Sequence, residues 1–222
     1  MTVSTDSEAA ANALPSPDDP APGRRRPGWL LLVGALLLGT LLGIGISLVV
    51  PQLRTPGDDS VEAGFLRDMA VHHAQAVEMS MIVHQKATDP DIVYLANDIA
   101  LTQQGQIGYM QAWLRDWNLS PTSTRQPMSW MPDSAGAVVN GLMPGMATPA
   151  QMADLRKATG KDLEMQYLTL MLQHHLGGIH MAQEAVALSH NKDVTWLAGA
   201  VVTSQQGEVT LIQDEIKKLQ AS

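Results

Sequence analysis

The chain has 222 residues, with 14 Lys and Arg against 22 Asp and Glu, and a formal charge of −8 at pH 7. This length allows one ordinary domain with extensions. No nucleic-acid binding is expected, because it depends on Lys and Arg contacts with phosphates. The absence of cysteine excludes disulfides, Cys-based zinc or iron–sulfur sites and a Cys nucleophile. The distinctive features that remain are 13 Met and 7 His.

The N-terminal part predicts a membrane anchor. Residues 1–27 are rich in Ala, Pro, Ser and Asp and are predicted to be a disordered cytoplasmic N-terminus. Residues 28–50 carry no charge and, at about 1.5 Å per residue, can cross a hydrocarbon core of about 30 Å. The run is longer than a cleavable signal peptide needs and lacks an A-x-A-like site. We predict an uncleaved transmembrane helix, followed by a linker over 51–59.

Three arginines, Arg24 to Arg26, precede this span, and no similar cluster follows it. The positive-inside bias therefore places the N-terminus in the cytoplasm. The chain is predicted to be a single-pass protein of the cell membrane, with its C-terminal domain on the extracytoplasmic or periplasmic side.

An internal duplication organises the outer domain, residues 60–222. FLRDMAVHHAQAVEMSM (65–81) and YLTLMLQHHLGGIHMAQ (167–183) align at a constant offset of 102 residues, and the same offset places TQQGQI (102–107) on SQQGEV (204–209). Gap-free matching of this extent predicts two copies of one unit, over about 60–118 and 161–219, with a Met-rich connection over 120–160.

Each copy is predicted to be a helical hairpin, with helices over about 60–86, 90–117, 161–189 and 191–219. Pro90 suits the first turn of the second helix, and Asn191 is a plausible N-cap of the fourth. Thr148 to Gln151 resembles a capping box that opens a short helix to about Ala158. No segment alternates with period two. The expected fold is all-α, an antiparallel four-helix bundle of the ferritin-like kind, preceded by one transmembrane helix.

The histidines lie on the core stripe of this bundle. On a helical wheel His72 and His73 fall near Met69 and the apolar stripe, and the second copy repeats the pattern with His174 and His175. The two inward pairs could approach each other and bind a metal, since neutral imidazole is a good ligand for Cu, Zn, Fe or Ni. Equally, they could be structural, with hydrogen-bond partners from Gln103, Gln106, Gln205 and Glu208.

Methionine favours copper among these metals, because a thioether is a soft, neutral ligand that suits Cu(I). The helical Met79 and Met181 could simply fill the core, whereas Met143 and Met146 belong to a connection in which exposed apolar filler is rarely needed. Trp113, Trp117 and Trp196 are assigned to the core or to packing between helices.

No hydrolytic or nucleotide-binding motif is present. A di-iron carboxylate site needs Glu-x-x-His on two helices. The corresponding positions read Gln103-x-x-Gln106 and Gln205-x-x-Glu208, without His. No enzyme activity is expected, although redox activity of a bound metal stays open.

The doubled M-x-x-H-H motif, with Met79 and Met181 and the preceding Met143-Pro-Gly-Met146-x-Thr-Pro, resembles the bacterial family called domain of unknown function 305 (DUF305). The resemblance covers about residues 58–219. It implies a secreted or membrane-anchored ferritin-like bundle, and some members are periplasmic copper-binding proteins.

We therefore expect a membrane-anchored extracytoplasmic protein that binds copper as Cu(I), anchored through residues 28–50. The expected metal ligands are His72, His73, His174, His175, Met69, Met171, Met79, Met181, Met143 and Met146. The alternative is a structural or protein-interaction module in which the His and Gln side chains only specify the bundle. The hairpins could pack within one chain or between two, so a homodimer stays open.

Overall fold

The structure is a computed structural model that describes residues 28–132, 134 and 136–221. The expectation for residues 1–27 falls outside this part. The chain divides into two units, helix α1 (Gly28–Arg54) and a helical domain that begins at Thr55. Within α1, Gly28–Ser47 has a mean hydropathy of 2.3 and is the one candidate membrane span in the described residues. A helix of this length and composition occurs both in membrane anchors and in signal sequences.

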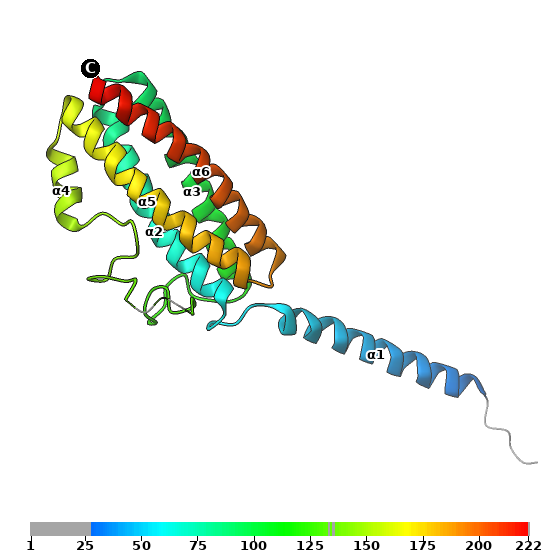
Figure 1. The fold of residues 1–222 in the computed structure, drawn as a ribbon. Coiled ribbons are helices and arrows are strands. Elements are labelled where there is room, and N and C mark those ends of the chain that lie inside the picture. Colours follow the sequence, from blue (N-terminus) through cyan, green and yellow to red (C-terminus); the bar gives the residue numbers. More distant parts are fainter. Residues whose placement is uncertain (1–27, 133, 135, 222) are drawn as a thin grey trace, which may run out of the picture. The chain divides into compact units, whose positions relative to one another are not determined.

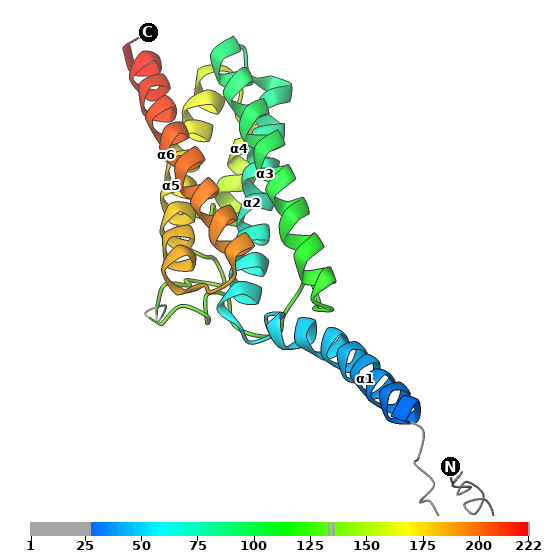
Figure 2. The same cartoon turned by 90° about the vertical axis from the view of Figure 1, so that its right-hand side faces the viewer.

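The domain is an antiparallel four-helix bundle built from α2 (Val61–Lys86), α3 (Pro90–Asp116), α5 (Gly160–Leu188) and α6 (Lys192–Ala221). One hairpin is α2 with α3, the other is α5 with α6, and the two pack together through α2 and α5 (Figures 1 and 2). The short helix α4 (Pro149–Lys157) lies beside α2 and α5. The described residues contain no named strand, only an isolated bridge between Val139 and Leu142. The predicted fold class is confirmed.

The helix starts follow from local capping chemistry. Thr148 and Gln151 form the predicted capping box at α4, each side chain bonding the other's backbone N–H. Asn191 Oδ1 accepts from the N–H groups of Asp193 and Val194, as expected of the N-cap of α6. These caps satisfy amides that the first helical turns leave without partners.

Two buried glutamates tie each hairpin to the loop of the other. Glu62, at the start of α2, accepts from Ser189 Oγ at 2.9 Å and from the His190 N–H at 3.0 Å, between α5 and α6. Glu164, its counterpart in α5, accepts from the Thr88 N–H at 2.8 Å, between α2 and α3. The exchange is reciprocal, as the pseudo-twofold relation between two duplicated hairpins requires.

The connection between the hairpins is part of the core at one end of the bundle. Met128, Met131 and Met143 are buried there against residues of all four long helices. The premise that this connection exposes its methionines is therefore wrong. Trp196 packs between helices rather than in the core: its side chain is 59% exposed and meets Tyr109 of α3 edge-on, with ring centroids 6.0 Å apart.

Candidate metal centre

Four fully buried imidazoles lie where α2 packs against α5. His72 and His73 come from α2, and His174 and His175 from α5; none of them is exposed. The rings of His72 and His174 are in contact, with centroids 3.8 Å apart and planes tilted by 35°. The sequence expectation that the two inward pairs approach each other is met, with one histidine from each pair forming the contact.

Hydrogen bonds fix which ring nitrogen of three histidines carries the proton. In each case Nε2 faces an acceptor oxygen: His72 lies 3.1 Å from Pro144 O, His73 2.7 Å from Gln106 Oε1 and His175 2.5 Å from Glu208 Oε2. Because a carbonyl, amide or carboxylate oxygen accepts, Nε2–H donates, and in the neutral ring Nδ1 holds the lone pair. Gln106 and Glu208 are thus two of the partners foreseen from the sequence.

Several buried nitrogen and oxygen atoms of these histidines and of two glutamines have no hydrogen-bond partner. Among the described residues, nine buried side-chain nitrogen and oxygen atoms are unpartnered, and they belong to six residues: His72, His73, Gln103, His174, His175 and Gln205. All four Nδ1 atoms are among them, and neither nitrogen of His174 has a partner of good hydrogen-bond geometry, although the nearby His72 backbone acts to raise the pKa of this ring. An unsatisfied buried polar group costs about 1–3 kcal/mol, so such a concentration in six residues is an unusual feature of this core.

Burial keeps the rings of His72, His73 and His174 uncharged. Desolvation lowers the pKa of His72 to about 4, although the hydrogen bond to Pro144 opposes this, and lowers the pKa of His73 to about 3. The pKa of His174 is lowered well below its usual value, by burial first and then by the neighbouring histidines. Neutral imidazole is the form that binds metal ions, so these groups need lose no proton near pH 7.

A backbone strap from the connection, Met143 to Ala147, lies over the pair of helices at His72. The Pro144 carbonyl oxygen approaches α5 so closely that a Cβ at Gly177 would collide with it. On the other side the Gln75 amide donates to Ala147 O at 2.9 Å and accepts from Ala147 N at 2.7 Å. No local pattern in the sequence predicts this strap. The adjacent glycines at 177 and 178 were the one signal that another stretch of backbone packs closely against this helix.

The methionines proposed as ligands are buried in the core of the bundle rather than displayed on the surface. Met69, Met79, Met171 and Met181 are fully buried, Met143 is 4% exposed, and Met146 is partly buried against the same core. In the described residues no three His, Asp or Glu side chains form a ready cluster for a metal ion. The available donors are neutral imidazole nitrogens and thioethers, a set suited to a soft ion of low coordination number.

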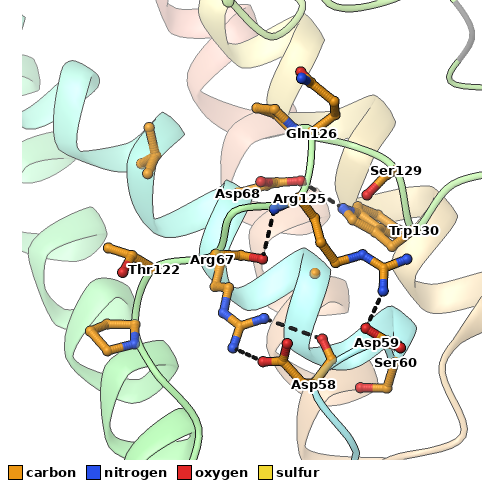
Figure 3. Close-up of a pocket in the computed structure, with 15 residues that line it drawn as sticks. Asp58, Asp59, Ser60, Arg67, Asp68, Thr122, Arg125, Gln126, Ser129 and Trp130 are labelled. Atoms are coloured by element: carbon orange, nitrogen blue, oxygen red, sulfur yellow. Dashed lines mark hydrogen bonds and ion pairs between the residues drawn. The ribbon is translucent and has the colours of Figure 1, made fainter.

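A separate pocket of about 200 Å³ lies at the start of α2, away from the histidines (Figure 3). Arg67 donates there to Asp58 Oδ1 at 2.5 Å and to Ser120 O at 2.9 Å. Asp68 accepts from the Met128 N–H, and burial raises the pKa of its carboxyl although this bond lowers it. These bonds fasten the connection to α2, and the sequence analysis missed them because their partners are 9 to 60 residues apart.

The family model of the domain of unknown function DUF305 matches residues 62–216, most of the chain. The chain belongs to this family. The crystal structure of a DUF305 protein from Streptomyces coelicolor is 44% identical and covers 74% of this chain and 96% of its own, with a TM-score of 0.68.

Two further comparisons are more distant. CopM in its Cu(I)-bound form is 19% identical over 72% of this chain and 96% of its own, with a TM-score of 0.56, a likeness that concerns the fold. Protein L153 of Acanthamoeba polyphaga mimivirus is 30% identical over 104 residues. That match covers 41% of this DUF305 chain and 66% of the viral protein, just under two thirds of its length.

Proposed function

We propose that this DUF305 protein is a membrane-anchored extracytoplasmic protein that binds copper, as Cu(I), in the histidine and methionine core of its bundle. It would buffer the ion or pass it on without turnover. The expected ligands are imidazole Nδ1 atoms of His72, His73, His174 and His175, with thioethers of the surrounding methionines.

The observation that carries the proposal is His174. This ring is fully buried at the contact between the hairpins, and neither nitrogen has a hydrogen-bond partner. A histidine kept only for its hydrogen bonds would have at least one, because burying an unpaired polar group destabilises the fold. Its ring contact with His72 brings imidazoles of the two hairpins together, which supports a binding site shared between them.

The choice of metal rests on the donor atoms and on a relative. Thioether and neutral imidazole are donors that favour Cu(I), and the chain has no thiolate to compete. CopM, which shares the fold, has been crystallised in Cu(I)-bound, Cu(II)-bound and Ag-bound forms. The location rests on the apolar helix α1 and on the Streptomyces coelicolor relative, which is described as a secreted protein.

The alternative is a module whose buried polar network only specifies the bundle. It is favoured by the hydrogen bonds of His73 with Gln106 and of His175 with Glu208, each of which joins the two helices of one hairpin. Such networks can fix a unique packing. The two functions predict different effects of replacing His174, which has no such bond: one predicts a loss of metal affinity, the other a loss of stability.

The deciding experiment is competitive titration of the full chain in detergent with Cu(I), Cu(II) and Zn(II) against chelators. H174L should weaken Cu(I) binding by at least about tenfold, while the metal-free protein keeps or gains stability because two unpaired nitrogens are removed. H180A is the matched control, since His180 lies on the same helix and is exposed. Failure of the unaltered protein to bind any of these metals would refute the proposal. A loss of stability in H174L with unchanged metal affinity would favour the structural module.

A further inference from the structure

An ion can reach the four histidines only if part of the protein moves, because none of the imidazoles has any exposed surface. The helices around them are firmly joined. Glu62 and Glu164 tie each hairpin to the loop of the other, and apolar side chains of the long helices fill the core. Separation of the helices would expose this core to water, which is costly. A smaller element that covers the histidines is therefore the better candidate for movement.

The strap is such an element, since it covers His72 with a single layer of backbone. The Pro144 carbonyl oxygen lies 3.1 Å from Nε2 of His72, which is a direct hydrogen bond. Pro144, Gly145 and Met146 are each only partly buried, so the strap itself is in contact with solvent. On this side of the bundle His72 is thus separated from water by one segment of chain.

Local bonds make the strap a compact unit. The Met146 N–H donates to the Met143 carbonyl oxygen at 3.1 Å, with Pro144 and Gly145 between them. Pro followed by Gly, with a φ of 81° at Gly145, is the pattern of a type II turn. Met143 is buried in the core, and Thr148 on the other side begins α4 with its capping box. The turn can therefore lift between two fixed points and keep its own hydrogen bond.

Few contacts hold this turn against the helices. In the described part of the chain, three hydrogen bonds join the strap to α2, and one of them is the bond from His72 to Pro144 O. The Gln75 side chain makes the other two with the backbone of Ala147, donating at 2.9 Å and accepting at 2.7 Å. Against α5 the strap packs at Gly177, where no side chain separates the two backbones. At a surface position the freed groups can bond to water, so each of these bonds contributes little net stability.

We propose that the strap is the gate of the histidine core, and that an ion enters or leaves when the turn from Met143 to Met146 lifts from the two helices. This inference rests on the proposed function and adds the route by which the ion reaches that site. Gln75 is a positioning residue that keeps the gate closed. Its equivalent in the second hairpin is Gly177, whose missing side chain leaves room for the closed strap.

Opening of the strap can be measured without any metal, by amide hydrogen exchange of the full chain in detergent with a chelator present. The Ala147 N–H, which is bonded to Gln75 Oε1, reports the strap, and N–H groups inside α2 and α5 report the bundle. Ala147 should exchange at least about tenfold faster than the core amides of the helices, and low urea should not change its rate, because a local opening exposes little surface. Exchange of Ala147 only at the rate of the helices would overturn the proposal.

Q75L tests the gate with metal, because it removes two bonds to the strap and alters none of the expected ligands. Transfer of Cu(I) from a chromogenic chelator to the protein, and back, is followed by stopped flow under anaerobic conditions. Both rates should rise by at least about tenfold in Q75L, whereas the equilibrium affinity should stay within about threefold, because the open state is reached more often and the bound state keeps its ligands.

Two further variants accompany this measurement, each checked for helical content by circular dichroism. Q104L is the matched control, since Gln104 is exposed on α3, and its transfer rates should stay within about twofold of the unaltered protein. G177A displaces the strap from α5 instead of from α2 and should accelerate transfer in the same direction as Q75L. It keeps the test decisive should Q75L fold poorly.

Transfer rates that stay unchanged in Q75L and G177A would overturn the gate while leaving metal binding itself intact. A changed affinity with an unchanged rate of uptake would do the same, since Gln75 would then act on the bound state and not on entry. If the unaltered protein takes up no Cu(I), the proposed function fails first and this inference with it, whatever the exchange rate of Ala147.

Discussion

The hairpin α2–α3 and the hairpin α5–α6 carry the same inward side chains, yet the connection between them treats the two differently. Met69, His72 and His73 in α2 recur in α5 at the 102-residue offset, and all are buried. Where α2 has Gln75, however, α5 has Gly177. The strap bonds to the first and passes close over the second. The paired histidines are thus the same in both hairpins, whereas the residue about one turn further along differs and sets how the connection contacts each helix.

Some residues that are the same in both hairpins hold the bundle together. Glu62 and Glu164 each cap the loop of the opposite hairpin, so neither hairpin is complete without the other. The residues that differ lie around the histidines. His72 bonds to the strap, the equivalent His174 has no partner of good hydrogen-bond geometry, and Glu208 places a carboxylate where the first hairpin has the amide of Gln106. Asymmetry is thus concentrated around the imidazoles.

Acid should have the largest effect on the metal-free domain, and both hairpins contribute to it. The pKa values of His72, His73 and His174 are lowered in the folded state, whereas unfolded histidines titrate near 6.5. The unfolded state therefore binds more protons as pH falls below about 6.5, and stability is lost from there toward pH 4. Each histidine contributes about 1.4 kcal/mol per pH unit within that window.

Chemical denaturation of the full chain with a chelator present, followed by circular dichroism from pH 7.5 to 5, measures this slope. H174L should reduce it by the share of one histidine, which separates the second hairpin's contribution from the first. Stability that is constant between pH 7 and pH 5 would contradict the assignment of these rings as buried and neutral.

A single substitution in α5 should displace the strap, because Gly177 is where its backbone packs closely against that helix. G177A places a Cβ against the Pro144 carbonyl oxygen, a backbone atom, so the strap must shift and its bond to His72 weakens. We expect a loss of about 1–3 kcal/mol in the free energy of unfolding. The control is G207A in α6, where a Cβ meets nothing within 4 Å and a gain of about 0.5–1 kcal/mol is expected from helix propensity.

Urea denaturation of both variants in parallel tests this difference, and Cu(I) affinity can be measured on the same samples. If the two alanine variants change stability in the same direction, the close contact between the strap and α5 does not explain the need for glycine at position 177.

The helices and the inward histidines were predictable from sequence because they depend on local patterns. Apolar periodicity put His72 and His73 on the core stripe, and capping chemistry gave the starts of α4 and α6 at Thr148 and Asn191. The repeat then transferred each conclusion to the second hairpin. Local periodicity and duplication together were sufficient for the fold class.

The course of the connection was not predictable, because it depends on contacts between residues far apart in the chain. Met128 is buried, and its N–H donates to Asp68, which is 60 residues away in the chain. The strap is held by the bond from Ala147 N to Gln75, 72 residues away. A Pro-, Gly- and Met-rich segment gives no periodic signal for such contacts.

The smallest expected effect concerns a buried pair that the two hairpins do not share. Ser80 Oγ and Tyr167 Oη lie 3.0 Å apart in the core, whereas their counterparts at the repeat offset are Ala182 and Phe65, which are apolar. S80A and Y167F should each cost about 1 kcal/mol of stability, because each leaves the other hydroxyl buried and unpaired. The double variant makes this layer apolar in both hairpins and should lie close to the unaltered protein. A double-mutant cycle by urea denaturation would measure the coupling, expected at about 2 kcal/mol, the sum of the two single losses that the double variant avoids. Losses that simply add would mean that each hydroxyl finds another partner, so that the difference between the hairpins at this layer has no energetic consequence.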